Sequence, residues 1–334
     1  MTTLPTTTTN SSLAASPGPE RAAWVGRLNL YSLSVFLVCG SLAFAAGVVW
    51  LFNYRHPWLA ATFHTLFAVA TASGAVLFVS LFLLQRWLAP PRNFAYAPLA
   101  GARIHVSLTA YNDEACIGDA VKEFRGASLA GQVIVVENNS KDRTRQEAQE
   151  AGADRVITEE IPGYGSCCMR ALAEAAEGLG DSDVIILCEG DMTFSACDIP
   201  KFLAYLENCD LVLGTRATQE LREKHTQMDW LINPANQVVA KLIQTRFWGT
   251  RLTDCGCTYR ALRVGSYRRL APNLIIRGNH FSPHMYIEAL KLGMRVIEIP
   301  IVFRKRQGLS KGVGSNKIKA AKVALAMLGL IYRA

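Results

Sequence analysis

Two long stretches of this chain contain no charged side chain. The first runs from Leu28 to Tyr54 and the second from Trp58 to Gln85. A helix of about 20 apolar residues crosses a bilayer, and each stretch exceeds that length. Because only the short segment 53–57 joins them, we expect a transmembrane hairpin with spans at 28–54 and 58–85. A pair of buried helices in a soluble core is the alternative, and the length of both stretches disfavours it.

The arginines around this hairpin predict its orientation. Arg21 and Arg27 precede the first stretch, further arginines from Arg86 onward follow the second, and Arg55 alone lies between them. Positive residues favour the cytoplasmic side of a membrane. We therefore expect both ends of the hairpin in the cytoplasm and the protein in the cytoplasmic membrane. Residues 1–27 are rich in Thr, Ser and Pro, which predicts a disordered terminus.

The net charge of +8 is concentrated toward the end of the chain, in a basic tail at 306–334. Nucleic acid attracts such tails, but beside two membrane spans an anionic lipid or a phosphate substrate is the better partner, and we expect no nucleic acid. The helix expected at 315–333 is apolar on one face, which predicts a helix lying at the membrane interface. Packing against the soluble domain is the alternative. The nine cysteines include no C-x-x-C pair and are expected to be free thiols.

Apolar strands alternate with helices between residues 103 and 305, after a linker at 88–102. We expect strands at 104–108, 132–136, 154–158, 184–188, 210–214 and 296–303, and helices at 116–124, 144–151, 166–177 and 219–250. This alternation is typical of an α/β fold with a mostly parallel sheet and helices on both faces. Polar clusters follow the strands, so they gather at the carboxyl edge of the sheet, where such folds bind ligands.

The clearest polar cluster is Glu189-Gly-Asp191, which directly follows the apolar segment 184–188. Residues two apart on a strand share a face, so both carboxylates can reach one point. Mg²⁺ is often held by one or two carboxylates together with the phosphates of a substrate. The segment therefore predicts a divalent-cation site, with an ordinary acidic turn as the alternative.

Seven short segments follow one another in a recognisable order between residues 104 and 311. They are SLTAYNDE at 107–114, VIVVENNSKDRT at 133–144, GYG at 163–165, EGD at 189–191, LGTR at 213–216, TDCGCTYR at 253–260 and RQGLSK at 306–311. They resemble the segments I-P-A-Y-N-E-E, V-I-V-V-D-D-G-S-x-D-x-T, G-K-G, D-x-D, G-S-R, T-D-x-x-S/C-G-F-R and R-x-G-x-S-K of the family 2 glycosyltransferases, which have the GT-A fold. Within that family the chain resembles the dolichyl- or polyprenyl-phosphate sugar synthases most.

The resemblance implies an enzyme that moves a sugar from a UDP- or GDP-linked donor to a polyprenyl-phosphate lipid. Glu189 and Asp191 would hold Mg²⁺ or Mn²⁺ against the departing diphosphate. A further set of residues would line the nucleotide: Thr109, Tyr111, Glu114, Glu137, Asn138, Gly163 and Gly190. Turn capping is the alternative role for Asn138 and its neighbours.

Family 2 enzymes invert the anomeric centre by direct displacement, and an acceptor that is already an anion needs positioning more than deprotonation. The cationic residues expected to hold its phosphate are Arg216, Arg260, Arg306 and Lys311. Arginine grips phosphate through two hydrogen bonds. Arg216 is the first choice because it follows a strand at the active edge. General attraction of the tail cations to anionic lipid is the alternative.

Several residues depart from the family pattern. Thr109 stands in place of Pro, Tyr164 in place of Lys, and Glu137-Asn138 in place of Asp-Asp. Glu189 replaces the first Asp of the metal motif and keeps a carboxylate with a longer reach. The lysine missing at Tyr164 removes a possible contact to the diphosphate, which leaves the nucleotide base open.

A second acceptor class would need a general base. His284 is the first candidate, because with His280 and Glu288 it falls on one face of a predicted helix. It would serve an acceptor hydroxyl on a glycolipid or glycan, while a satisfied histidine is the alternative. A third hypothesis is a GT-A-like membrane protein that binds a nucleotide sugar without turnover. The sequence leaves the sugar, the lipid length and the oligomeric state open.

Overall fold

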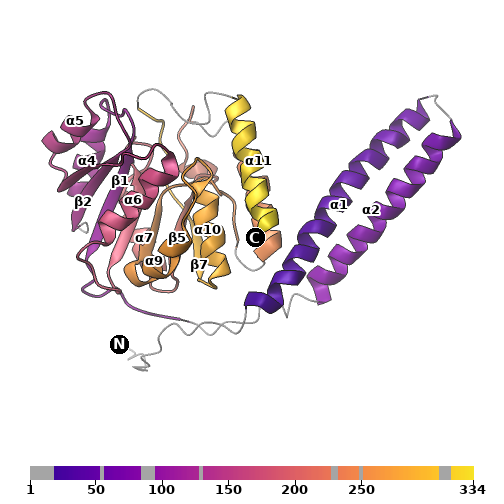
Figure 1. The fold of residues 1–334 in the computed structure, drawn as a ribbon, viewed down its shortest axis with the longest axis horizontal. Helices are drawn as coiled ribbons and strands as arrows, with labels where there is room; N and C mark the ends of the chain where they lie inside the picture. The colour runs from indigo at the N-terminus through magenta and orange to yellow at the C-terminus, as the bar shows by residue number, and fades with distance from the viewer. Residues whose placement is uncertain are drawn as a thin grey trace.

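The computed structural model consists of an apolar two-helix hairpin and an α/β domain beside it (Figure 1). It describes residues 19–52, 56–83, 95–127, 131–226, 232–247, 251–307 and 317–334. The expected disordered segment up to residue 18, residues 88–94 of the expected linker, and Lys311 lie outside the described residues.

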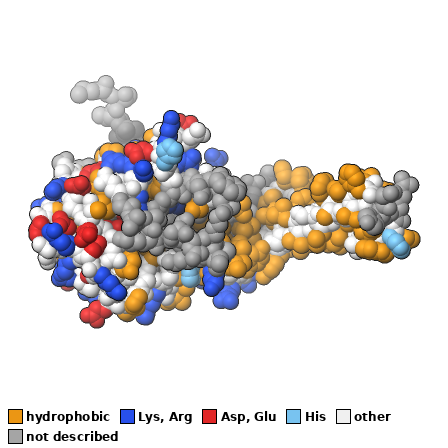
Figure 2. All heavy atoms as spheres, turned by 90° about the horizontal axis from the view of Figure 1, so that it is seen from above, with side chains coloured by type: hydrophobic (Ala, Val, Ile, Leu, Met, Phe, Trp, Pro, Cys, Tyr) orange, Lys and Arg blue, Asp and Glu red, His pale blue; other side chains and the backbone are white. Residues whose placement is uncertain are grey.

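The hairpin is formed by α1 (Pro19–Leu51) and α2 (Pro57–Leu83), which pack along each other. Two stretches are long and apolar enough to cross a membrane, Ala23–Leu51 and Pro57–Leu83. Figure 2 shows hydrophobic side chains along the length of the hairpin, whereas Lys, Arg, Asp and Glu side chains are scattered over the α/β domain. The expectation of disorder is wrong for residues 19–27, which form the first turns of α1.

The α/β domain is built on a seven-stranded sheet with the order β3-β2-β1-β4-β6-β5-β7. Its strands are β1 (Ile104–Ala110), β2 (Gln132–Glu137), β3 (Arg155–Thr158), β4 (Val184–Glu189), β5 (Leu211–Thr215), β6 (Arg260–Arg263) and β7 (Val296–Pro300). All neighbouring pairs are parallel except those that β6 makes with β4 and β5. The predicted mostly parallel sheet is therefore confirmed.

Helices cover both faces of the sheet, as the alternation predicts. They are α4 (Ile117–Gly126), α5 (Thr144–Glu150), α6 (Tyr164–Ala176), α7 (Ile199–Leu206), α8 (Ile232–Phe247), α9 (Val264–Leu270), α10 (Phe281–Lys291) and α11 (Lys317–Arg333). Successive residues of a strand point to opposite faces. In β4, Ile185 and Leu187 accordingly join the core beneath α6, α8 and α10, while Val184 and Ile186 join the core beneath α4 and α7. This explains why the sequence of β4 is apolar without a break.

Two expected elements differ in the structure. The helix expected at 219–250 is a short 3₁₀ turn, Gln219–Leu221, followed by the later α8. The reason is a main-chain contact, because the N–H of Glu223 donates to the carbonyl of Phe303 at 2.9 Å. The strand expected to reach residue 303 ends at Pro300, and Phe303 makes only isolated bridges to neighbouring segments.

The last helix joins the α/β domain to the hairpin. Along α11, Ile331 is fully buried and Leu325 is 68% exposed, and the helix contacts α8 and α10. Its Tyr332 ring lies 5.8 Å from that of Tyr31 in α1. In addition, α8 lies so close to α1 that a Cβ on Gly26 would come within 1.9 Å of the carbonyl oxygen of Arg246. The structure thus gives α11 a packing role, and its contact with the membrane interface stays a prediction.

Candidate active site

The carboxyl ends of β1, β2, β4 and β5 meet at one edge of the sheet, and β4 delivers the two predicted carboxylates there. Thr109 of β1 lies in register with Glu189, and its carbonyl accepts a hydrogen bond from the N–H of Gly190 at 2.9 Å. A Cβ on Gly190 would come within 2.4 Å of Ile117 Cδ1. A side chain between Glu189 and Asp191 would therefore have to displace the buried Ile117, which favours glycine in this turn.

Asp191 is 2% exposed and is held on two sides. Its Oδ1 accepts hydrogen bonds from the N–H and the hydroxyl of Thr193, at 3.1 and 2.5 Å. Its Oδ2 lies 3.2 Å from Nη1 of Arg306. Burial and the nearby Glu189 carboxylate raise the pKa of Asp191 to about 6, against the opposing effect of Arg306. The carboxylate therefore lies in a site where a further positive charge would stabilise its ionised form.

Arg306 links Asp191 to a second acid. Its Nη2 donates to Oδ1 of Asp113 at 2.9 Å, and the other oxygen of Asp113 accepts from the N–H of Tyr111 at 2.9 Å. The Nε of Arg306 is buried and has no hydrogen-bond partner among the described residues. This side chain therefore keeps a donor free beside the two aspartates, and its predicted role at the acceptor phosphate stays a prediction.

Glu189 is held by hydroxyl groups. Its Oε1 accepts from Oγ1 of Thr258 at 2.5 Å and from the hydroxyl of Tyr164 at 3.3 Å. Tyr164 and Thr258 are also hydrogen-bonded to each other. Burial, together with the neighbouring Cys168 and Glu189, raises the pKa of Tyr164 well above its ordinary value. The phenol consequently remains a proton donor toward the carboxylate at neutral pH.

These residues fit a divalent cation of the Mg²⁺ type. The described part of the chain contains no group of three or more His, Cys, Asp or Glu side chains that would enclose a metal by itself. Two carboxylates completed by substrate phosphates and water are, however, a common Mg²⁺ arrangement. The guanidinium of Arg306 against Asp191 shows that this carboxylate accepts a cationic neighbour. The all-oxygen donor set suits Mg²⁺ or Mn²⁺ better than Zn²⁺.

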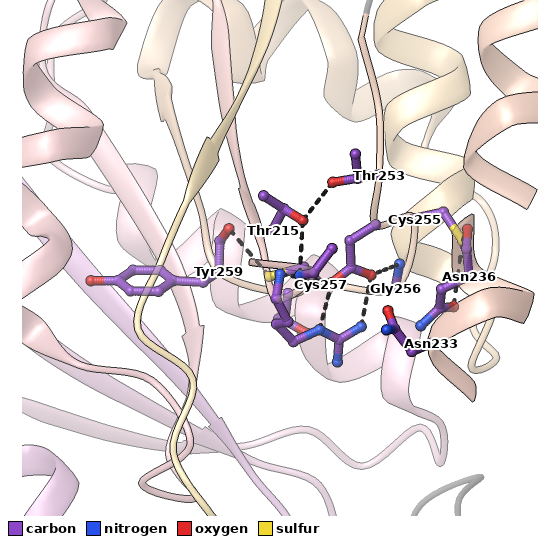
Figure 3. Close-up of polar contacts among 12 residues, drawn as sticks. Thr215, Asn233, Asn236, Thr253, Cys255, Gly256, Cys257 and Tyr259 are labelled. Atoms are coloured by element: carbon purple, nitrogen blue, oxygen red, sulfur yellow. Dashed lines mark hydrogen bonds and ion pairs between the residues drawn. The ribbon is translucent and has the colours of Figure 1, made fainter. Parts of the chain in front are cut away.

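Arg216, the first choice for the acceptor phosphate, is paired with Asp254. The loop beside this pair is held by a hydrogen bond between the hydroxyl groups of Thr215 and Thr253 (Figure 3). Nε and Nη2 of Arg216 lie 2.6 and 2.8 Å from the two carboxylate oxygens of Asp254, whose side chain is fully buried. Burial alone would raise the pKa of Asp254. Arg216 and main-chain N–H groups lower it by more than burial raises it, so the pKa lies below its ordinary value. Glu298 of β7 accepts from the N–H groups of Thr253 and Asp254 and fixes the loop.

Two of the expected nucleotide-binding residues form hydrogen bonds that hold neighbouring loops in place. Glu137 accepts from the N–H of Ser140 at 2.7 Å and also bonds Thr158. Asn138 accepts from the N–H of Gly163 at 2.8 Å and donates to two carbonyls of the segment 159–161. These contacts agree with the turn-capping alternative, and both side chains are buried.

Other nucleotide candidates remain open to a ligand or shape the edge. Tyr111 is 46% exposed beside Asp113. Glu114 accepts from the N–H of Arg143 at 2.9 Å. Gly163 has a φ of +134°, and a Cβ there would come within 2.3 Å of the Arg277 carbonyl oxygen. Glycine is thus required where the loop passes the 277 segment.

Arg260 and His284 are buried side chains that bond main-chain atoms. Arg260 is 2% exposed and donates to carbonyls of Thr258 and Ser282, at 3.2 and 3.4 Å. Nε2 of His284 lies 3.0 Å from the carbonyl oxygen of Asn273. Burial lowers the pKa of His284, although Glu288 and that carbonyl act in the opposite direction. The predicted helix face is corrected as well, because α10 begins at Phe281 and His280 lies before it.

The sequence analysis missed several residues that build this edge. Asp113, which bonds Arg306, lies inside a quoted segment but was given no role. Thr258 and Asp254 lie inside the TDCGCTYR segment, and Glu298 lies on β7. The position of Asp254 and Asp113 as acidic residues inside the quoted segments is the signal that could have identified them, whereas their pairing with Arg216 and Arg306 is visible only in the folded chain.

Comparison with known proteins supports this description of the site region. The family model Glycosyl transferase family 2 matches residues 106–271. Glycosyltransferase AglJ of Haloferax volcanii is 28% identical over 200 residues, which cover 59% of this chain and 61% of that protein. The match thus spans less than two thirds of that relative. The dolichyl-phosphate hexose transferase of the same organism is 28% identical over 208 residues, covering 62% of this chain and 85% of the relative.

Among solved structures, glucosyl-3-phosphoglycerate synthase from Mycobacterium tuberculosis, in complex with Mn²⁺, UDP and glucosyl-3-phosphoglycerate, is similar. The TM-score is 0.52 at 19% identity, over 70% of this chain and 81% of that one. At this identity the likeness shows a shared fold. The matched region and the mostly parallel sheet agree with the motif order, and residues 106–271 of the chain form a glycosyl transferase family 2 domain.

Proposed function

We propose that this protein is a membrane-anchored, inverting glycosyltransferase that moves a sugar from a UDP- or GDP-linked donor to polyprenyl phosphate. The observation that carries the proposal is the cluster of Glu189, Asp191 and Arg306 at the carboxyl edge of the sheet. A diphosphate group needs a cation, which the two carboxylates of this cluster could hold. An acceptor phosphate needs a positive side chain, which Arg306 supplies. The name of the dolichyl-phosphate hexose transferase supports the same acceptor class.

The residues would divide the work as follows. Glu189 and Asp191 would hold Mg²⁺ or Mn²⁺, which when bound would offset charge on the departing diphosphate. Arg306 would orient the acceptor phosphate for attack from the face opposite the leaving group, with Lys311 as a further candidate. Arg216 would stabilise the edge through Asp254 and face the acceptor only with its remaining N–H groups. We leave Arg260 out of the acceptor site, because it is buried and bonds main-chain carbonyls.

The membrane-facing part of the proposal rests on α1 and α2. Both are long and apolar enough to span a bilayer, and in the sequence arginines precede the first span and follow the second. The positive-inside bias then puts the site in the cytoplasm, where nucleotide sugars are donors, next to the lipid. We propose 28–87 as the anchor, 103–305 as the catalytic domain and 306–334 as a basic tail near the membrane surface.

A hydroxyl acceptor is less well supported. Deprotonating a hydroxyl requires a base within hydrogen-bond reach, and His284 is 3% exposed with Nε2 at the Asn273 carbonyl. A phosphate acceptor requires no such base.

The test is turnover by the detergent-solubilised full chain. The protein is given undecaprenyl phosphate, Mn²⁺ and a panel of UDP- and GDP-sugars, and a new sugar-bearing lipid is detected by mass. We expect a product with at least one donor, lost with a chelator. A glycan product without any lipid product would overturn the phosphate acceptor. Nucleotide-sugar binding without turnover on any acceptor would identify a binding protein instead.

A further inference from the structure

Three side chains from separate parts of the fold meet at one oxygen of the metal-site glutamate. Tyr164 begins α6, Glu189 ends β4, and Thr258 lies just before β6. The Thr258 hydroxyl is 2.5 Å from Oε1 of Glu189, and the Tyr164 hydroxyl is 3.3 Å from the same atom. The two hydroxyls also bond each other. Oε1 of Glu189 is thus the carboxylate oxygen that both hydroxyls contact.

The direction of these hydrogen bonds follows from the chemistry of the groups. An ionised carboxylate can only accept, and the two hydroxyls have one proton each. Thr258 donates its proton to Oε1, and Tyr164 shares its proton between Oε1 and the Thr258 hydroxyl oxygen. Thr258 is 1% exposed, and Ser282, whose Oγ lies 3.5 Å from the Tyr164 hydroxyl, is 3% exposed. Water has little access to this side of Glu189. The hydroxyl pair consequently determines where Oε1 points.

The second carboxylate oxygen of Glu189, Oε2, has different surroundings. Among the described residues, none donates a hydrogen bond to Oε2 of Glu189. Building on the proposed function, we propose that Thr258 and Tyr164 are positioning residues that hold Glu189 as a one-oxygen ligand, so that Oε2 alone reaches the divalent cation. This arrangement would favour Mg²⁺ and Mn²⁺ over Ca²⁺, because Mg²⁺ demands a compact octahedral shell whereas Ca²⁺ readily takes both oxygens of a carboxylate.

The three residues also depart together from the family segments quoted above. Glu189 stands in place of Asp, Tyr164 in place of Lys, and Thr258 in place of Gly. The longer glutamate has one more rotatable bond than aspartate, and the two hydroxyls restrict the freedom that this bond adds. The contacts among the three therefore explain how a glutamate can serve at this position.

The test measures binding of Mn²⁺ alone to the chelator-stripped, detergent-solubilised full chain, by the loss of the free-ion EPR signal, followed by competition with Ca²⁺. We expect Thr258→Val and Tyr164→Phe each to weaken Mn²⁺ binding by about 10- to 100-fold, the range for partners of metal ligands. Each should also reduce the preference for Mn²⁺ over Ca²⁺. Thr258→Ser keeps the hydroxyl and should stay within about threefold of wild type in Mn²⁺ affinity.

Tyr286→Phe is the matched control, because its buried hydroxyl has no hydrogen-bond partner among the described residues. It should bind Mn²⁺ like wild type. A thermal midpoint checks that each variant is folded, and Tyr164→Phe carries the test if Thr258→Val does not fold. Unchanged Mn²⁺ affinity and metal preference in the folded variants, alongside Mn²⁺-dependent transfer by wild type, would overturn this inference alone. Wild type that neither binds Mn²⁺ nor transfers sugar would overturn the proposed function as well.

Discussion

Arg216 and Arg306 lie at the same edge of the sheet, and each is paired with buried aspartate, but their surroundings differ. Around Arg216, each oxygen of Asp254 accepts two hydrogen bonds. Oδ1 accepts from Arg216 Nη2 and from the N–H of Gly256. Oδ2 accepts from Arg216 Nε and from the main-chain N–H of Arg216. Around Arg306, Oδ2 of Asp191 is paired only with the guanidinium, and Nε has no partner among the described residues.

The difference separates a structural ion pair from a ligand site. A buried carboxylate whose two oxygens each accept two hydrogen bonds has nothing left to offer a cation, and removing its arginine partner leaves an uncompensated charge. A pair with an unmatched donor and an acidic partner of raised pKa gains from a further ligand. We therefore expect the Arg216 region to control stability and the Arg306 region to control binding and transfer.

Asp191→Asn should have the largest effect and should break the Arg306 region. Loss of the cation ligand is expected to reduce transfer by at least about a thousandfold, the scale of losing a main electrostatic contact in catalysis. The measurement is the rate of lipid-linked sugar formation at saturating Mn²⁺. Asp183→Asn, at the opposite end of β4 and bonded to Arg103, is the control and should keep its transfer rate. An Asp191→Asn variant as active as wild type would contradict the assignment.

Arg216→Gln tests the matched pair. It leaves the Asp254 carboxylate buried without its counter-charge, which is expected to lower the free energy of unfolding by about 3 kcal/mol. The measurement is denaturant unfolding of the solubilised protein, with Mn²⁺ present and absent. Mn²⁺ should not restore the lost stability. Replacing both partners, Arg216→Met with Asp254→Leu, should cost less than the single change; a double variant as unstable as the single one would argue against a closed pair.

Arg306→Gln sharpens the comparison between the two arginines, because Mn²⁺ should restore stability to this variant. Without Mn²⁺, the variant leaves Asp113 and Asp191 facing each other and is expected to lose about 2 kcal/mol of unfolding free energy. A cation at 100 times its Kd contributes about 2.7 kcal/mol of stability. Mn²⁺ should therefore stabilise this variant more than it stabilises wild type, measured as the shift in thermal midpoint. Equal shifts in both proteins would mean that Arg306 and the cation do not share Asp191.

Local patterns explain why much of the fold was predictable. The apolar segments 132–136 and 184–188 are buried on both faces and lie between polar turns, so the sequence indicates each strand by itself. By contrast, β6 has the sequence Arg-Ala-Leu-Arg and runs antiparallel between β4 and β5. Nothing in four residues with arginine at both ends predicts a buried strand. Its place depends on neighbours far away in the chain.

The same distinction applies to the site. Glu189 and Asp191 were identified because a single segment carries both. The Arg306 contact to Asp113 joins residues 193 positions apart, so only the folded chain shows it. The roles of the other arginines also depend on partners that only the folded chain shows. Arg216 and Arg260 carry the same guanidinium group, but Arg216 bonds a carboxylate and Arg260 bonds main-chain carbonyls.

The smallest expected effect is a difference in acid sensitivity between Arg216→Gln and wild type. The pKa of Asp254 lies below its ordinary value because Arg216 and main-chain N–H groups outweigh burial. Such a carboxylate stabilises the fold above about pH 4, the ordinary range for aspartate, and this contribution is lost as the pH falls through the lowered pKa. Wild type should therefore begin to lose stability from this pair as the pH falls below about 4, and continue to lose it down to the lowered pKa. In Arg216→Gln only the main-chain N–H groups still oppose burial, so the pKa of Asp254 rises and the variant should lose less stability between pH 5 and pH 3 than wild type does. Thermal midpoints across that range measure the difference, and other acids contribute equally to both proteins. Parallel curves would show that the Arg216 pair does not control the ionisation of Asp254, and the contrast between the two regions would then rest on binding alone.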